Sequence, residues 1–353
     1  MRWVIASVLV VVAALAAWLL VPWRGGPPEI AAAGDPARGE YLLRLGGCVS
    51  CHTAKDGAFL AGGRALATPF GTFRTPNITP DPATGIGGWS AGAFVRAVRD
   101  GVAPAGHPYF PAFPYTSYTR MTEQDLLDLK AYLDTIEPVT NSVPAHALDF
   151  PYGLRALLDG WRLLFFENGR FEPDPAQSEV WNRGAYIVTG PGHCGECHTP
   201  RNALGAREEG RRLAGARDGP DGKPVPNITP HQDGIGGWSK GDIAFALQTG
   251  ILPDGDVLGG AMAEVVEDAT SHLSADDLGA IAEYLLSLPA LPDAPAPADG
   301  EEEGEEAGEL MPGVASSEVH ARSARPGRPV RAPRRRSSAR AAGLRRLVSR
   351  TGA

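Results

Sequence analysis

Apolar residues recur at helical spacing in two pairs of segments along the chain. Over residues 126–136 and 278–288 they fall every three or four positions, which predicts two amphipathic helices. Shorter helical segments are predicted over residues 37–45 and 180–188. No stretch shows the sustained alternation of a β-strand, and 32 prolines with 44 glycines indicate long irregular connections. The pattern therefore predicts small all-α domains.

Three predicted helices begin with a hydroxyl residue that is followed by an acid three positions later. A side-chain oxygen at the residue before a helix accepts a hydrogen bond from an otherwise unpaired N–H of the first turn. The pairs are Thr122 with Asp125, Ser239 with Asp242, and Ser274 with Asp277. We expect each pair to fix the start of its helix.

The hydrophobic pattern changes at the N-terminus, where an uncharged run extends from Val4 to Val21. These eighteen apolar or small residues, bounded by Trp3 and Trp23, predict a bilayer-spanning helix with interfacial anchors. A cleaved signal peptide is the alternative, although the small-residue site at 31–33 lies far beyond the run. Both alternatives export the chain. We expect residues 1–24 to be a membrane anchor.

The rest of the chain contains the same motifs twice, in the same order. The run CVSCH recurs as CGECH, PNITP recurs unchanged, GIGGWS recurs unchanged, and LLDLKAYL recurs as LGAIAEYL, at offsets between 146 and 152 residues. Four blocks at nearly constant offset indicate a duplicated domain. We predict domains over residues 35–137 and 178–290.

Two further segments lie outside the repeat. Residues 138–177 connect the domains, and the apolar residues at 154–166 predict a packed helix within them. Residues 291–353 are poor in aromatics, acidic at first and then arginine-rich, so we expect a disordered tail. From Asp299 onward there are eight acids and eleven arginines, which leaves −11 on residues 1–298. The acidic remainder argues against nucleic-acid binding.

Each Cys-x-x-Cys-His run predicts the covalent attachment of one haem c. Two thiols three residues apart on a helical turn form thioethers with the haem vinyl groups, and the next histidine binds the iron. The first motif is Cys48, Cys51 and His52, and the second motif is Cys194, Cys197 and His198. Zinc ribbons place their cysteine pairs much closer together, and a redox dithiol or disulfides would leave both histidines unexplained.

The sequence offers few candidates for the sixth ligand of each iron. Apart from the initiator and Met311 in the tail, each predicted domain has one methionine, Met121 and Met262. A methionine ligand raises the reduction potential and closes the iron to substrates, whereas a lone methionine near a helix is otherwise core filling. The spacing in the second domain, transferred to the first, points near residue 110, so His107 is the alternative to Met121.

Four other residues recur near the motifs. Trp89 and Trp238, and Asn77 and Asn227, are candidates for hydrogen bonds to haem propionates, and core packing or turn formation explains them equally well. His193, which directly precedes Cys194, is predicted to be a surface neighbour of the second motif.

With these residues in place, the sequence resembles the multihaem cytochrome c subunits of bacterial membrane-bound alcohol and gluconate dehydrogenases and related dihaem cytochromes. The resemblance runs from about residue 35 to residue 289 and rests on the motifs above together with PAFPYTSYTRMT, GHCGECHTPRN and MAEVVEDATSHLSADDLGAIAEYLLSLP. Those subunits typically have three haem domains, whereas this chain has two. The resemblance implies tandem class I-like cytochrome c domains that accept electrons from a catalytic subunit and deliver them to quinone, a cytochrome or a terminal oxidase.

Two functions follow as expectations. The first is a membrane-anchored periplasmic dihaem electron carrier of the respiratory chain, in which both irons are six-coordinate and no catalytic residue is present. Its acidic surface predicts docking to a basic patch that salt weakens. The second is a dihaem enzyme of peroxidase or thiosulfate dehydrogenase type, in which one haem has an open or labile position.

Overall fold

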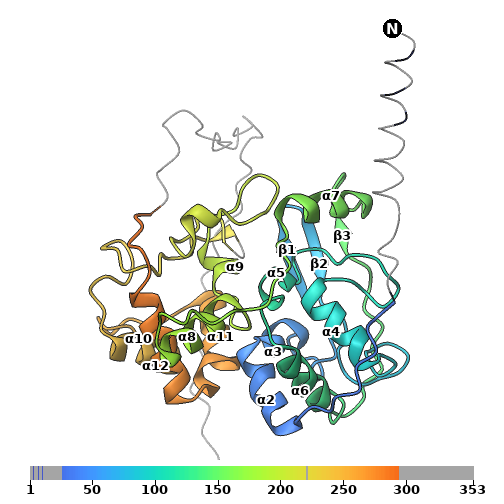
Figure 1. Ribbon diagram of the computed structural model, residues 1–353, viewed down its shortest axis with the longest axis horizontal. Coiled ribbons are helices and arrows are strands. Elements are labelled where there is room, and N and C mark those ends of the chain that lie inside the picture. Colours follow the sequence, from blue (N-terminus) through green and yellow to red (C-terminus); the bar gives the residue numbers. More distant parts are fainter. Residues whose placement is uncertain (1–2, 4–6, 8–9, 11–25, 220–221, 294–353) are drawn as a thin grey trace, which may run out of the picture. The chain divides into compact units, whose positions relative to one another are not determined.

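The computed structural model describes residues 3, 7, 10, 26–219 and 222–293 (Figure 1). These residues contain eleven α-helices, two 3-10 helices and one small sheet, so the described part of the chain is mostly helical. None of the helices in these ranges is long and apolar enough to cross a membrane. Most of the predicted membrane anchor at 1–24, and residues 294–353 of the predicted tail at 291–353, lie outside the described residues.

The first half of the described chain, residues 35–137, contains five helices and two strands. They are α2 (Pro36–Leu45), α3 (Cys48–His52), β1 (Ala65–Thr68), β2 (Gly71–Arg74), α4 (Ala91–Asp100), α5 (Tyr115–Tyr118) and α6 (Glu123–Leu133). α2 begins where Asp35 accepts a hydrogen bond from the N–H of Ala37, with Pro36 in the first turn. α6 begins at Thr122, whose hydroxyl accepts from the N–H of Asp125, as predicted.

The second half, residues 178–290, repeats the order of helices. Its elements are α8 (Glu179–Thr189), α9 (Gly195–His198), η1 (Glu209–Arg211), α10 (Lys240–Thr249), α11 (Gly260–Asp268), η3 (Thr270–His272) and α12 (Ala275–Leu286). The predicted caps at Ser239 and Ser274 are confirmed, and Ser239 with Asp242 forms a complete capping box. The predicted helices at 37–45 and 180–188 are confirmed to within two residues at each end.

The first and last helices of each half pack directly on one another. α2 contacts α6, and α8 contacts α12, at points where a helical glycine allows the backbones to approach closely. A Cβ added to Gly39 would lie 2.0 Å from the carbonyl oxygen of Asp128, and one added to Gly184 would lie 2.0 Å from that of Ala280. The α2–α6 and α8–α12 crossings therefore both depend on a glycine at the point of contact.

Buried apolar residues of both halves form one continuous cluster. It includes Leu42 and Leu126 of the first half together with Ile187 and Leu285 of the second, all at most 5% exposed. Residues 35–137 and 178–290 therefore share one core, and their division into two domains stays a prediction.

Matching hydrogen bonds also link the halves. Tyr186 of α8 donates to Asp125 of α6, and its hydroxyl accepts from the N–H of Thr122 at 3.3 Å. In return Tyr41 of α2 donates to Asp277 of α12 at 2.6 Å and accepts from the N–H of Ser274 at 3.2 Å. Each tyrosine thus binds the start of the other half's closing helix.

Each of the two aspartates also binds an arginine of its own half. Arg183 forms a two-pronged ion pair with Asp277, at 2.8 and 2.7 Å, and Arg38 pairs with Asp125. The acids that follow the caps of α6 and α12 therefore bind arginine and tyrosine side chains of neighbouring helices. Their main role is tertiary, which the local capping pattern did not predict.

A small sheet makes the all-α prediction wrong in one region of the first half. β1 pairs antiparallel with β2, and β2 pairs with β3 (Ala147–Leu148) from the connector. Strands of four, four and two residues are too short to show a sustained alternation, so the hydrophobic pattern did not reveal them. Phe73 of β2 packs with Phe110 and Leu158 in a separate small cluster.

The connector contains the predicted helix, as α7 (Ala156–Phe165), but only part of it is packed. Leu158 and Arg162 are buried, whereas Leu157, Leu163 and Leu164 are between 53% and 69% exposed. Trp161 donates to the carbonyl oxygen of Leu204 at 2.9 Å, which ties this helix to the second half.

Candidate functional site

The first motif occupies α3, a five-residue helix that follows Gly47 in the left-handed conformation (φ 60°). Cys48 and Cys51 are separated by one helical turn, and both thiols are free. Burial raises the pKa of Cys48 to about 12 and also raises the pKa of Cys51.

The second motif has the same local form. α9 places Cys197 one turn after Cys194, and both thiols are again free. Burial raises the pKa of Cys194 to about 12 and that of Cys197 to about 11. His193, which precedes this motif, adopts the left-handed conformation (φ 39°) at the position of Gly47.

Both motif histidines are held by the same type of hydrogen bond. Nδ1 of His52 lies 2.8 Å from the carbonyl oxygen of Pro76, and Nδ1 of His198 lies 2.7 Å from that of Pro226. A carbonyl oxygen can only accept, so Nδ1 carries the proton and Nε2 keeps its lone pair. Burial lowers the pKa of both imidazoles, which favours the neutral form.

The two prolines begin the repeated PNITP runs, so this bond gives the repeat a physical role that the sequence did not reveal. In metal sites a ligating histidine typically donates its other N–H to a carbonyl or carboxylate. Each motif thus offers two thiols for covalent attachment and one oriented imidazole nitrogen. This donor set fits haem c. Over residues 26–219 and 222–293 no cluster of three His, Cys, Asp or Glu side chains could hold a metal ion by itself.

The structure places the predicted sixth ligands in different surroundings. Met121 is 1% exposed and directly precedes the cap of α6, whereas Met262 is half-buried in the first turns of α11. His107 is exposed, and its ring contacts the ring of Tyr109. Of the two candidates in the first half, Met121 is thus the buried one.

Asn77 and Asn227 are both 3% exposed and fasten the PNITP runs to the chain that leaves each half. The amide of Asn77 donates to the carbonyl oxygen of Val139 at 2.7 Å, and that of Asn227 donates to Leu291 at 2.7 Å. The side-chain oxygen of each accepts from the backbone N–H two residues later. These bonds account for both asparagines as turn and tie residues, and a bond to a propionate stays a prediction. Trp89 and Trp238 pack, half-buried, against the core.

Glu196, inside the second motif, was not predicted as a site residue. Its carboxylate accepts from Arg207 at 2.7 Å and Arg201 at 2.6 Å, and from the hydroxyls of Thr116 and Ser117 of the first half. Burial alone would raise the pKa of Glu196, but the two guanidinium charges and the two hydroxyls outweigh it and lower the pKa to about 2. The side chain is therefore a buried anion whose partners come from both halves.

The two motifs also approach each other through His193, which the sequence had placed at the surface. A Cβ added to Gly47 would lie 3.2 Å from Nε2 of His193, and the His193 ring packs edge-on against Tyr118 at 5.5 Å. The hydroxyl of Tyr118 donates to the carbonyl oxygen of Gly46 at 2.7 Å. The residues that precede Cys48 and Cys194 thus lie together between the halves, and His193 is half-buried there and not fully at the surface.

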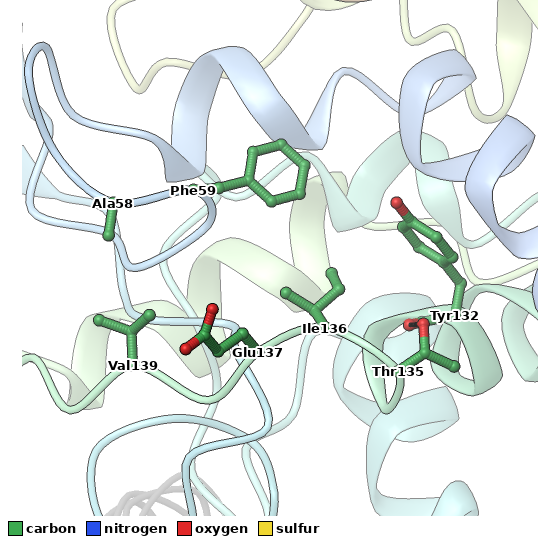
Figure 2. A pocket seen from close by; sticks show the side chains of 7 residues that line it. All are labelled: Ala58, Phe59, Tyr132, Thr135, Ile136, Glu137 and Val139. Atoms are coloured by element: carbon green, nitrogen blue, oxygen red, sulfur yellow. Dashed lines mark hydrogen bonds between the residues drawn. The ribbon is translucent and has the colours of Figure 1, made fainter.

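A cavity of about 420 Å³ lies elsewhere in the first half, between the loop after α3 and the end of α6 (Figure 2). It is lined by Ala58, Phe59, Tyr132, Thr135, Ile136, Glu137 and Val139. No predicted site residue is among them, and Glu137 is the only acid. The cavity is therefore separate from both motifs.

Comparison with known proteins agrees with this site chemistry. The family model for cytochrome c matches residues 36–137. A protein named diheme cytochrome c-type from Cereibacter sphaeroides is 45% identical over 293 residues, which cover 81% of this chain and 97% of the relative.

Cytochrome subunits of dehydrogenases are also similar. The gluconate 2-dehydrogenase cytochrome c subunit of Pantoea cypripedii is 41% identical over 261 residues, covering 71% of this chain and 59% of the relative. The fructose dehydrogenase cytochrome subunit of Gluconobacter japonicus is 40% identical over 269 residues, covering 74% of this chain and 55% of the relative. This chain therefore spans only part of the dehydrogenase subunits that it matches. The resemblance inferred from the motifs is confirmed, and the chain belongs to the c-type cytochromes.

Proposed function

We propose that this chain is a dihaem electron-transfer protein, exported and membrane-anchored, that passes single electrons from a dehydrogenase to a respiratory acceptor. Its cofactors are two covalently bound haem c groups, one for each motif. Haem c, when bound, supplies a reversible one-electron iron couple. The two halves are then tandem class I-like cytochrome c domains.

The observation that carries this proposal is the repeated orientation of the motif histidines. In both halves Nδ1 donates to the first proline of PNITP, at 2.8 and 2.7 Å, so both Nε2 atoms are available to iron. The free thiols of Cys48, Cys51, Cys194 and Cys197 supply the covalent bonds. Two equal attachment sites support two haems and a role in carrying electrons between them.

Methionine is the proposed sixth ligand in both halves, Met121 for the first haem and Met262 for the second. The burial of Met121 supports this assignment over the exposed His107. A buried thioether ligand stabilises the reduced iron and leaves no position for a substrate. We therefore assign the chain to electron transfer and not to a peroxidase or thiosulfate dehydrogenase activity.

The proposed donor is the catalytic subunit of a dehydrogenase. Relatives with similar sequences are cytochrome subunits of alcohol, fructose and gluconate dehydrogenases, which supports a partner of this kind. Quinone, another cytochrome or a terminal oxidase is the proposed acceptor. The excess of acids over residues 1–298 suits a basic docking surface on a partner. Haem c attachment takes place on the outer side of the bacterial cytoplasmic membrane, and we propose that location.

Removal of one attachment site at a time tests the proposal. The full chain, produced in a host that attaches haem c, is expected to keep two haems after denaturation, measured by mass and by haem absorbance per polypeptide. Replacing both Cys48 and Cys51 with alanine should leave one haem, and so should replacing both Cys194 and Cys197. A wild-type protein without covalent haem would refute the proposal. Two covalent haems with a high-spin iron that binds azide would favour the enzyme alternative.

A further inference from the structure

α5 lies between the two attachment motifs and leads directly to Met121. At its N-terminal end, Thr116 and Ser117 donate to Glu196 of the second motif at 2.7 and 2.6 Å. At its C-terminal end, Tyr118 donates to the carbonyl oxygen of Gly46, two residues before Cys48. Three consecutive residues of the first half, Thr116, Ser117 and Tyr118, therefore join the regions of both motifs.

The connection from α5 to Met121 is continuous and buried. The N–H of Met121 donates to the carbonyl oxygen of Tyr118 at 2.9 Å, and the N–H of Arg120 donates to that of Ser117 at 3.0 Å. Ser117 and Met121 are each 1% exposed. Residues 117–121 thus form one hydrogen-bonded turn with both ends buried, so a shift of Ser117 moves Met121 with it.

The carboxylate of Glu196, to which Ser117 binds, is held in place by several partners. Besides the two hydroxyls, it binds Arg201 and Arg207, and Arg207 also donates to the Ser117 hydroxyl at 2.8 Å. A buried carboxylate with four partners has one preferred position, because loss of any partner leaves a desolvated charge. The position of Ser117 is thus set by the second half.

The equivalent position in the first motif has no such role. Ser50 stands where Glu196 stands, and its hydroxyl donates to the carbonyl oxygen of Gly47, directly before its own motif, at 3.1 Å. The reverse connection, from α11 to the first motif, runs through Arg64, which donates to the Ser50 carbonyl and pairs with Glu264 at 2.7 Å. This ion pair is partly exposed on both sides and is correspondingly weak.

We propose that Glu196, a residue of the second haem's attachment motif, is a positioning residue for Met121 at the first haem. The inference rests on the proposed function, since it requires that Met121 binds iron. It makes the ligation of one haem dependent on a side chain that belongs to the site of the other.

The test is the haem-loaded full-length variant Glu196→Gln, which keeps the side-chain shape and removes the charge. Variants Met121→Leu and Met262→Leu serve as references, because each removes the ligand of one haem and identifies its spectrum. We expect the methionine–iron charge-transfer absorption of Glu196→Gln to fall toward about half, as in Met121→Leu. The potential of the first haem should fall, and carbon monoxide should bind that reduced haem.

Two more variants separate positioning from general damage. Ser117→Ala removes a partner of Glu196 from the first half and should change the first haem in the same direction by a smaller amount, because Thr116 remains. Ser50→Ala is the matched control in the first motif, and both methionine ligands should stay in place. If Glu196→Gln fails to fold, Ser117→Ala gives the same test from the other side of the contact.

The outcomes are distinct from those of the proposed function. A wild-type protein without haem, or one in which Met121→Leu leaves the spectrum unchanged, would overturn the proposed ligation and this inference together. If the references behave as expected but Glu196→Gln or Ser117→Ala keeps the wild-type spectrum, only the inference fails. A loss that matches Met262→Leu, or an equal loss at both haems, would also overturn it.

Discussion

Met121 in the first half and Leu273 in the second occupy equivalent positions, one residue before the cap of the closing helix. Both are buried, at 1% and 6% exposure. The methionine of the second half, Met262, lies instead on α11, outside the closing-helix junction. The two halves therefore share the α2–α6 and α8–α12 crossings and the histidine–proline bond, but they place their methionines on different segments. The helix crossings and the histidine–proline bond are therefore shared by the two halves, whereas the segment that contains the methionine differs between them.

The interface between the halves, in contrast to the methionine segments, is nearly symmetric, because each half contributes the same kinds of contact. Tyr41 and Tyr186 make matching bonds to Asp277 and Asp125. Tyr186 is 6% exposed, whereas Tyr41 is half-buried. The two tyrosine–aspartate bonds are chemically the same but differ in solvent exposure. Comparing their contributions to the free energy of unfolding therefore measures the effect of burial within one molecule.

The largest expected effect comes from making the first half resemble the second. Met121→Leu places the residue of position 273 at position 121 and nearly conserves side-chain volume, so the free energy of unfolding should fall by less than about 1.5 kcal/mol. The first haem should nevertheless lose its sixth ligand. Absorption spectra and carbon monoxide binding of the reduced protein measure this directly.

Met262→Leu is the matched variant and should affect only the second haem. An unchanged spectrum in Met121→Leu would mean that Met121, like Leu273, is a core residue. In that case His107→Ala should remove the ligand instead.

A smaller effect is expected at the interface. Tyr186→Phe removes the hydrogen bond to Asp125 in a nearly closed environment and should lower the free energy of unfolding by about 1–2 kcal/mol. Tyr41→Phe removes the corresponding bond to Asp277 where water has better access, so its cost should be lower. Denaturant unfolding of the haem-loaded variants measures both values. Equal costs would show that burial does not decide the difference.

The smallest effect is a dependence on pH at Asp277. Burial would raise the pKa of Asp277, but the bonds from Arg183 and Tyr41 outweigh it and hold the pKa below its ordinary value of 3.8. A carboxylate with a lowered pKa stabilises the fold fully above that ordinary value and loses its contribution as the pH falls through the folded pKa. The free energy of unfolding should therefore decrease below about pH 4.

The variant Asp277→Asn isolates this contribution. It should be less stable than the wild type at neutral pH, and the difference between the two proteins should shrink as the pH falls. A difference that stays constant down to about pH 3 would contradict the sign of the shift.

Local features of the fold were predictable from the sequence, because they depend on neighbouring residues. The helix starts at Thr122, Ser239 and Ser274 follow from one hydroxyl and the adjacent N–H groups. The attachment motifs follow from five consecutive residues. The short strands β1 and β2 did not follow, since pairing with each other and with β3 stabilises them more than their own pattern does.

Contacts between distant residues could not be predicted for the same reason. Glu196 and its partner Thr116 are 80 residues apart, and Tyr41 and Asp277 are 236 residues apart. A signal was present for the carbonyls of Pro76 and Pro226, since PNITP recurs with each motif. That the run supplies a backbone oxygen to a histidine became clear only from the geometry.

The ties made by Asn77 and Asn227 have a practical consequence. Both asparagines begin an Asn-Ile-Thr sequence, which eukaryotic secretory pathways use as an acceptor for N-linked sugar. In the folded protein each asparagine is 3% exposed and its amide donates to a backbone carbonyl, so a glycan at either position would require that bond to break. Glycosylation during secretion from yeast or mammalian cells would therefore compete with folding, whereas a bacterial host avoids that competition.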